Sequence, residues 1–198
     1  MTLLANLVAT SQRVGATSGR LAKIRELAAF LRALAPEEIE TGAHYLSGEI
    51  PQGRIGIGYA TLRTAAGNAP ASEAGISLAE ANSALTELAA IRGAGSTAAR
   101  AAALARLFAR ATRDEQQFLL RLLTGELRQG ALAGVMVDAI AAAAEIPVSV
   151  VRRAAMYSQS LGAVARVALL QGAEGLAGFH LQLFSPVSPH ACPNCRRC

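Results

Sequence analysis

An internal repeat limits the folds open to this chain more than any other feature of its sequence. Residues 46–53, Leu-Ser-Gly-Glu-Ile-Pro-Gln-Gly, recur at an offset of 77 residues as residues 123–130, Leu-Thr-Gly-Glu-Leu-Arg-Gln-Gly. At the same offset, without gaps, Leu27 aligns with Leu104. Two copies are too few for a solenoid, which needs at least three stacked repeats. We therefore expect a duplicated helical unit with pseudo-twofold symmetry, its copies spanning about residues 17–58 and 94–135.

Apolar spacing predicts an all-α body. From Leu21 to Leu34 the apolar residues fall three and four positions apart, as on one face of a helix. Thr17 or Ser18 is the expected N-cap of that helix. Ser77 with Glu80 and Thr112 with Glu115 have capping-box spacing. These pairs predict helices ending near Ile91 and Thr124, and further helices are expected from Ser96 and over residues 131–144, 149–158 and 160–171.

Two segments break the helical pattern. Residues 64–77 are rich in Gly, Ala, Pro and Ser, which is typical of a surface loop or linker. After Gly172 the residues alternate between apolar and polar, which predicts a short extended tail. The length favours one compact domain. We expect a helical domain over residues 1–184 and a linker remnant with a cysteine-rich tail over residues 185–198.

The charge of the chain favours an acidic partner. Its 198 residues carry a net charge of +5, and 18 of the 19 cationic residues are arginine, Lys23 being the one lysine. The chain contains no Trp, five Phe and three Tyr, too few rings for stacking single-stranded bases, so a duplex held by its backbone is the better candidate.

Cysteine usage and hydropathy predict the compartment. All three cysteines lie in the last seven residues, which fits a reducing cytoplasm. The chain contains no run of about 18 apolar residues, so its sequence predicts no membrane-spanning helix. We expect a cytoplasmic, nucleoid-associated monomer without a membrane partner.

The repeated turn has a chemistry suited to phosphate. Gly48 and Gly125 sit where the C-terminus of a helix favours a left-handed residue. Gly53 and Gly130 allow close backbone approach before a new segment, and the free amides at a helix N-terminus bind anions. Arg54 flanks the first turn, and Arg128 lies inside the second. Two such sites could hold the two strands of a duplex. The alternative is that the glycines only close tight turns between helices.

Residues 46–58 and 122–144 carry a family resemblance. The block Gly-Glu-Leu-Arg-Gln-Gly with Asp138-Ala139 downstream resembles the N-terminal DNA-binding domain of bacterial ATP-dependent DNA ligases. The resemblance covers about residues 1–189, including Arg20 and Lys23 early in the chain and Ser-Pro-Val-Ser-Pro at residues 185–189.

The resemblance implies an all-helical domain that grips duplex DNA, preferably nicked, across the minor groove. The family acts in DNA repair, replication and recombination, and its full-length members use ATP and Mg²⁺, whereas no cofactor is expected for this chain. Carried over by position, the expected DNA contacts are Gly48, Gly53, Arg54, Gly125, Arg128 and Gly130, with Arg20 and Lys23 as weaker candidates. For the weaker pair, the alternative is a solvated charge on a helix face.

The chain departs from the family in its chemistry. Ligation requires a Lys-x-Asp-Gly lysine, but Lys23 is followed by Ile24, Arg25 and Glu26. We therefore expect no catalytic residue here and no nick sealing by this chain alone.

The last residues offer a second departure, because the resemblance stops after Pro189. The tail holds His190, Cys192, Cys195 and Cys198, four soft ligands within nine residues. Such close spacing strains a tetrahedral zinc site, and a frameshift or premature end before the nucleotidyltransferase domain is the interpretation we prefer.

Two other functional classes stay open at this stage. The first is a helical protein-interaction domain whose glycines only aid packing, and the second is a zinc-dependent regulator. His44, at the end of a predicted helix, is expected to be a packing or surface residue rather than a catalytic base.

Overall fold

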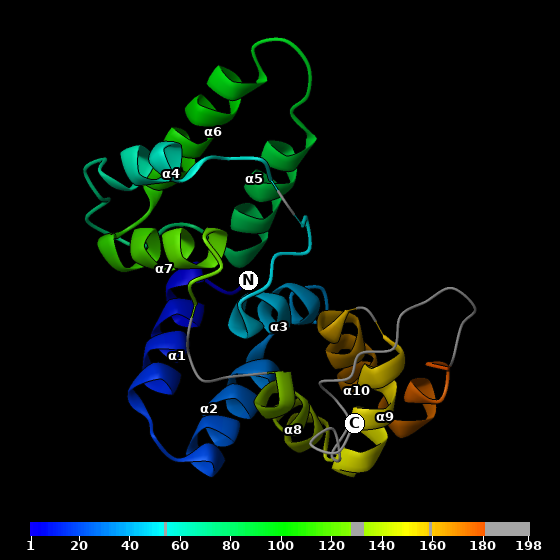
Figure 1. The fold of residues 1–198 in the computed structure, drawn as a ribbon. Coiled ribbons are helices and arrows are strands. Elements are labelled where there is room, and N and C mark those ends of the chain that lie inside the picture. Colours follow the sequence, from blue (N-terminus) through cyan, green and yellow to red (C-terminus); the bar gives the residue numbers. More distant parts are fainter. Residues whose placement is uncertain (54, 128–132, 159, 181–198) are drawn as a thin grey trace, which may run out of the picture. The chain divides into compact units, whose positions relative to one another are not determined.

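The computed structural model describes residues 1–53, 55–127, 133–158 and 160–180, and these residues form ten α-helices (Figure 1). Strand pairing within these ranges amounts to one isolated bridge, between Leu3 and Ser77. The predicted all-α class is therefore confirmed. The helices are α1 (Leu4–Ala16), α2 (Arg20–Ala33), α3 (Ile39–Ser47), α4 (Tyr59–Ala66), α5 (Leu78–Ala90), α6 (Ser96–Arg110), α7 (Arg113–Leu123), α8 (Ala133–Ala144), α9 (Val148–Tyr157) and α10 (Leu161–Leu176).

The chain forms two compact units. Unit 1 comprises Met1–Ala9 and Gly48–Leu127, and unit 2 comprises Thr10–Ser47 and the described part of Arg128–Cys198. Unit 1 therefore holds α4 to α7, unit 2 holds α2, α3 and α8 to α10, and α1 runs from the first into the second. That residues 1–184 act as one domain stays a prediction.

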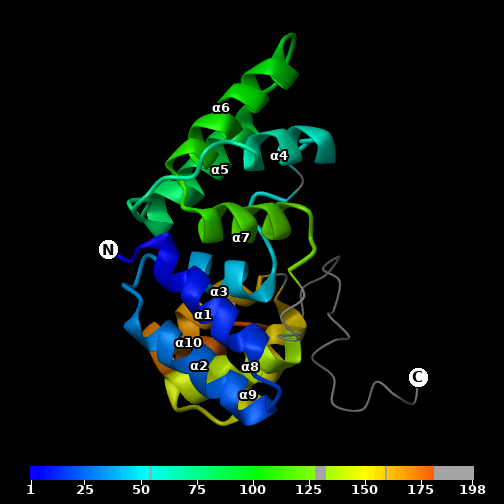
Figure 2. The ribbon, with the colours of Figure 1, turned by 90° about the vertical axis from the view of Figure 1, so that its left-hand side faces the viewer.

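The third helix of each sequence copy packs in the unit of the other copy. At the offset of 77 residues, α2 corresponds to α6, α3 to α7 and α4 to α8, so the correspondence extends past residues 58 and 135, where the predicted copies end, to a third helix. Within unit 1, α4 packs against α6 and α7, and within unit 2, α8 packs against α2 and α3 (Figures 1 and 2). Each unit thus combines two helices of one copy with the third helix of the other. The pseudo-twofold axis itself stays a prediction.

Equivalent positions of the two copies are buried in both cores. Leu27 and Leu31 of α2 are fully buried in unit 2, and their counterparts Leu104 and Phe108 of α6 are fully buried in unit 1. This agrees with the apolar stripe, because residues three and four apart lie on one face of a helix. Tyr45 of α3 is also fully buried, and its burial raises the pKa of its phenol.

Both predicted capping boxes are confirmed. Ser77 Oγ accepts from the Glu80 amide at 3.1 Å, and Glu80 Oε2 accepts from the Ser77 amide at 2.9 Å. Thr112 and Glu115 make the same two bonds at the start of α7. Reciprocal bonds of this kind satisfy amides that a helix start leaves without a partner.

Other boundaries differ from the prediction. The predicted cap of α2 by Thr17 or Ser18 is wrong: the N-cap is Gly19, without a side-chain bond, and the Thr17 hydroxyl instead donates to Arg13 O at 2.8 Å. Residues 64–66, predicted as loop, are the last turn of α4. Finally, α10 runs to Leu176, but its backbone kinks at Gly172 (φ 67°, ψ −156°), which agrees with the predicted helix end at residue 171. The extended tail predicted around residues 179–183 falls largely outside the described residues.

Acid is expected to destabilise unit 1 through Glu80. The guanidinium of Arg110, 2.8 Å away, and the bonds from Ser77 lower the pKa of Glu80 from its ordinary 4.5 to about 2. A carboxyl group with a lowered pKa stabilises the fold above its unfolded value and stops doing so as the pH falls through its folded value. Stability should therefore fall between pH 4.5 and 2.

Urea unfolding at a series of pH values measures this contribution. The Glu80→Gln variant should show a shallower decline over that range than the wild type. Glu87→Gln, on the exposed face of the same helix, is the matched control and should keep the wild-type slope. Equal slopes for wild type and Glu80→Gln would show that the ion pair does not contribute.

Candidate nucleic-acid interface

The two repeated turns have the left-handed glycines that the sequence predicts. Gly48, with φ of 82°, follows the last residue of α3, and Gly125, with φ of 70°, lies two residues after α7. At the second turn Gly125 N donates to Leu122 O at 3.2 Å and Glu126 N to Arg121 O at 2.8 Å. These two hydrogen bonds form the Schellman motif, in which the residue after the C-cap, here Gly125, has a left-handed conformation. The positive φ explains why glycine recurs here.

Both turns line one depression in unit 1. The depression has a volume of about 510 Å³, and a Cβ atom added to Gly48 would lie 3.6 Å from Leu127 Cβ. Two segments separated by 77 residues in the sequence therefore meet in space. The residues lining the depression are mainly apolar: Gly48, Ile50, Gly53, Ile55, Gly56, Ile57, Leu62, Leu122, Leu123, Thr124 and Gly125.

Gly53 of the first turn and Gly125 of the second can be approached closely from outside. Gly53, with φ of 64°, and Gly125 are exposed, and a Cβ atom added to either would meet nothing within 4 Å among the described residues. Their amides, however, already donate within the chain, Gly53 N to Ile50 O at 3.1 Å and Gly125 N to Leu122 O at 3.2 Å. These two glycines thus allow close contact but do not offer a free amide donor.

The helix after the first turn begins later than expected. We predicted a new segment immediately after Gly53, but α4 begins at Tyr59 with Gly58 as its N-cap, and no side chain caps it. Gly58 is exposed, and a Cβ atom there would also meet nothing within 4 Å. The first turn of α4 thus has amides without a side-chain cap, and such amides at a helix N-terminus can bind an anion.

Gln52 anchors the first turn and was missed from the sequence. Its Nε2 donates to Asn82 Oδ1 at 2.8 Å and to Thr86 Oγ1 at 2.9 Å, both on α5. The repetition of Gln52 as Gln129 is the sequence signal for this role, whereas the predicted contacts are the turn glycines and arginines. Arg100 of α6 holds Gly56, four residues after Gln52, because its guanidinium donates to Gly56 O at 3.4 Å.

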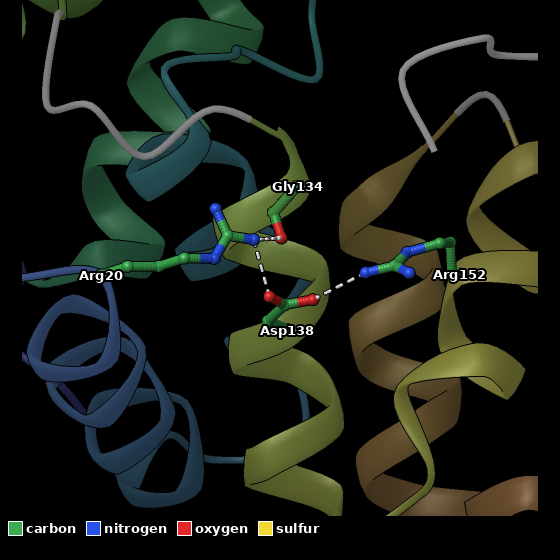
Figure 3. A network of polar contacts seen from close by, with 4 residues as sticks. All are labelled: Arg20, Gly134, Asp138 and Arg152. Atoms are coloured by element: carbon green, nitrogen blue, oxygen red, sulfur yellow. Dashed lines mark hydrogen bonds and ion pairs between the residues drawn. The ribbon is translucent and has the colours of Figure 1, made fainter. Parts of the chain in front are cut away.

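The two weaker candidates lie in unit 2. Arg20, the first residue of α2, donates through Nη2 to Asp138 Oδ2 at 2.7 Å and to Gly134 O at 3.2 Å (Figure 3). Asp138 Oδ1 accepts from Arg152 Nη2 at 3.2 Å. Arg20 is therefore ion-paired, while its side chain remains 56% exposed. Lys23 lies half-buried one turn further along α2.

Several predicted site residues fall outside the described part of the chain. These are Arg54, Arg128 and Gly130 of the DNA-binding set and His190, Cys192, Cys195 and Cys198 of the tail.

Within the described ranges no group of three or more His, Cys, Asp or Glu residues could hold a metal. None of the helices in the same ranges is long and apolar enough to cross a membrane.

His44 is a buried packing residue, one of the two roles expected for it. It is 6% exposed, and its Nε2 lies 3.0 Å from Ser160 Oγ. Ser160 Oγ also accepts from the Ala163 amide at 3.0 Å as the N-cap of α10. Because the hydroxyl is used in capping, the pair serves to join α3 and α10.

Comparisons with known proteins agree with the resemblance. Residues 65–141 match the family model of the DNA ligase N terminus. The chain is 54% identical over 187 residues to a probable DNA ligase of Anaeromyxobacter sp. (strain Fw109-5), with 94% of this chain and 36% of the relative covered. Probable DNA ligases of Rhodococcus jostii (strain RHA1) and Sorangium cellulosum (strain So ce56) are 50% and 46% identical, with 94% of this chain and 37% and 35% of the relatives covered. The chain thus spans about a third of the length of these relatives, and the resemblance to the ligase N-terminal region is confirmed.

Proposed function

Because the chain is a relative of the DNA ligase N terminus, we propose that it binds duplex DNA without reading the base sequence. Its preferred ligand would be a nicked duplex, which it would hold during DNA repair, replication or recombination. The observation that carries this proposal is the meeting of the two left-handed glycine turns on one depression of unit 1.

The geometry of the turns suits a phosphate backbone. Gly53, Gly58 and Gly125 remove side chains at exposed positions, so a sugar-phosphate strand can approach the main chain closely. The first turn of α4 supplies amides and the positive end of a helix dipole. Arg54 and Arg128 adjoin the two turns in the sequence and would supply the charge. Backbone phosphate contacts of this kind position a protein on DNA but carry no sequence information.

Strand joining is not assigned to these residues. In the family, which uses ATP and Mg²⁺, the group that reacts with ATP is a Lys-x-Asp-Gly lysine, and the 198 residues contain one lysine, followed by Ile24, Arg25 and Glu26. The residues present do not fit an adenylated site, so a ligation step would belong to a part of the relatives that this chain does not span.

Salt titration of DNA binding tests the proposal. For a nicked duplex oligonucleotide, log K should fall linearly with log salt, with a slope of about −0.9 for each phosphate neutralised. Arg128→Ala should reduce the slope by about 1 and weaken binding equally for unrelated duplex sequences. Fluorescence anisotropy measures both quantities.

The matched control for this loss of charge is Arg166→Ala, an exposed arginine of α10, which should keep the wild-type slope. Two results would contradict the proposal: absence of duplex binding at moderate salt, or equal affinity for an unrelated polyanion.

A further inference from the structure

Asp138 brings two arginines together in unit 2. It lies on α8, and its two carboxylate oxygens accept from different helices: Oδ2 from Arg20 of α2 at 2.7 Å and Oδ1 from Arg152 of α9 at 3.2 Å (Figure 3). These contacts join residues separated by 118 and 14 positions in the sequence. One carboxylate therefore fixes the positions of two guanidinium groups.

The charges of this cluster are unevenly exposed. The Asp138 side chain is 18% exposed, whereas those of Arg20 and Arg152 are 56% and 30% exposed. One negative and two positive charges leave a net charge of +1, and the negative group is the most covered of the three. The two guanidiniums are therefore the more exposed groups of these three, and Glu145 lines the same depression as Asp138 and Arg152.

Arg20 keeps donors for an outside ligand. Its Nη2 makes both described contacts, and Figure 3 shows the other terminal nitrogen pointing away from Asp138. A guanidinium carries five N–H donors in a planar fork that matches the oxygens of a phosphate. A fork held by a carboxylate on one edge loses less entropy when it binds a phosphate with the other edge.

The start of α8 adds to the positive potential. Arg20 Nη2 contacts Gly134 O, in the first turn of α8, and a Cβ atom at Gly134 would lie 4.0 Å from that nitrogen. The guanidinium therefore lies beside a helix N-terminus, where the dipole also favours an anion.

We propose that Arg20 and Arg152 form a binding site for DNA backbone phosphates in unit 2, and that Asp138 is the residue that positions both. This inference rests on the proposed function and extends it, because it adds Arg152, for which the sequence suggested no role. Asp138, although acidic, would therefore strengthen the binding of a polyanion.

The direction in which DNA affinity changes when Asp138 is replaced separates a positioning role from a purely electrostatic one. If Asp138 acts only through its charge, its removal should strengthen DNA binding, because a negative charge repels phosphate. If it positions the arginines, Asp138→Asn should weaken binding about three- to tenfold, because the amide keeps one acceptor oxygen but turns an NH2 donor toward the second guanidinium. Glu174→Gln, the same loss of charge at an exposed position of α10, is the matched control and should leave affinity unchanged or slightly raised.

The experiment is a salt titration of nicked-duplex binding by the full chain and its variants. Arg20→Ala and Arg152→Ala should each weaken binding about tenfold at moderate salt and reduce the salt slope by about 1. Arg152→Lys keeps the charge but loses the fork, so it should keep most of the slope and only part of the affinity. Circular dichroism establishes that each variant is folded, and if Asp138→Asn does not fold, the slopes of the arginine variants decide.

The outcomes distinguish this inference from the proposed function. Steep salt dependence in the wild type, with unchanged slopes for both arginine variants, would overturn the phosphate site and leave duplex binding intact. Tighter binding by Asp138→Asn would overturn the positioning role. Absence of salt-dependent duplex binding in the wild type would overturn the proposed function and the inference together.

Discussion

Replacing Gly162 with alanine is expected to lower the free energy of unfolding by about 3 kcal/mol, the upper end of the usual cost of overpacking. A Cβ atom at this position of α10 would lie 2.6 Å from Glu40 O and 2.6 Å from His44 Nε2, both on α3. The first neighbour is backbone and cannot rotate away. The second is held 3.0 Å from Ser160 Oγ, so moving the ring would also disturb the cap of α10.

Chemical denaturation followed by circular dichroism measures this loss. The matched control is Gly15→Ala, which makes the same change near the end of α1, where an added Cβ atom meets nothing within 4 Å. That control should be neutral or stabilise by up to about 1 kcal/mol, because alanine favours helix over glycine. A Gly162→Ala variant as stable as the wild type would show that α10 does not pack this closely on α3.

Truncating the equivalent core leucines of the two copies is expected to cost about 2–5 kcal/mol each. Leu27 in unit 2 and Leu104 in unit 1 are both fully buried, and they occupy the same position of the repeat. Leu→Ala removes apolar contacts and leaves a cavity that the surrounding helices fill only in part. Losses in this range in both variants would show that the position belongs to the core in each unit.

Leu21 of α2 supplies a matched control for these variants. It is 70% exposed, so Leu21→Ala should change stability by no more than about 0.5 kcal/mol. Urea midpoints at a constant m-value give the comparison directly. A Leu27→Ala or Leu104→Ala variant no less stable than Leu21→Ala would contradict the assignment of that leucine to a core.

Local interactions made much of the fold predictable. The capping boxes at Ser77 and Thr112 depend on residues three apart, and the left-handed turns at Gly48 and Gly125 depend on the absence of one Cβ atom. Such features follow from short stretches of sequence whatever the rest of the chain does. The failed cap at Thr17 has a local cause as well, because its hydroxyl bonds within the preceding helix.

The candidate sites were less predictable because their partners are distant in sequence. The block that contains Asp138 was noted as part of the family resemblance, but the pairing of Asp138 with Arg20 joins residues 118 positions apart. Gln52 was visible in the repeat, yet its acceptors on α5 lie 30 and 34 residues away. No periodicity or spacing reports such contacts.

The sequence by itself determined an all-α chain, its duplicated Gly-Glu turns and the absence of a Lys-x-Asp-Gly lysine, because composition, helical period and backbone sterics act over a few residues. Only the tertiary structure decided that α4 and α8 each pack with the helices of the other copy, and that Arg20 is held in an ion pair. The reason is that burial and ion pairing depend on which surfaces meet, and many arrangements of helices satisfy the same local pattern.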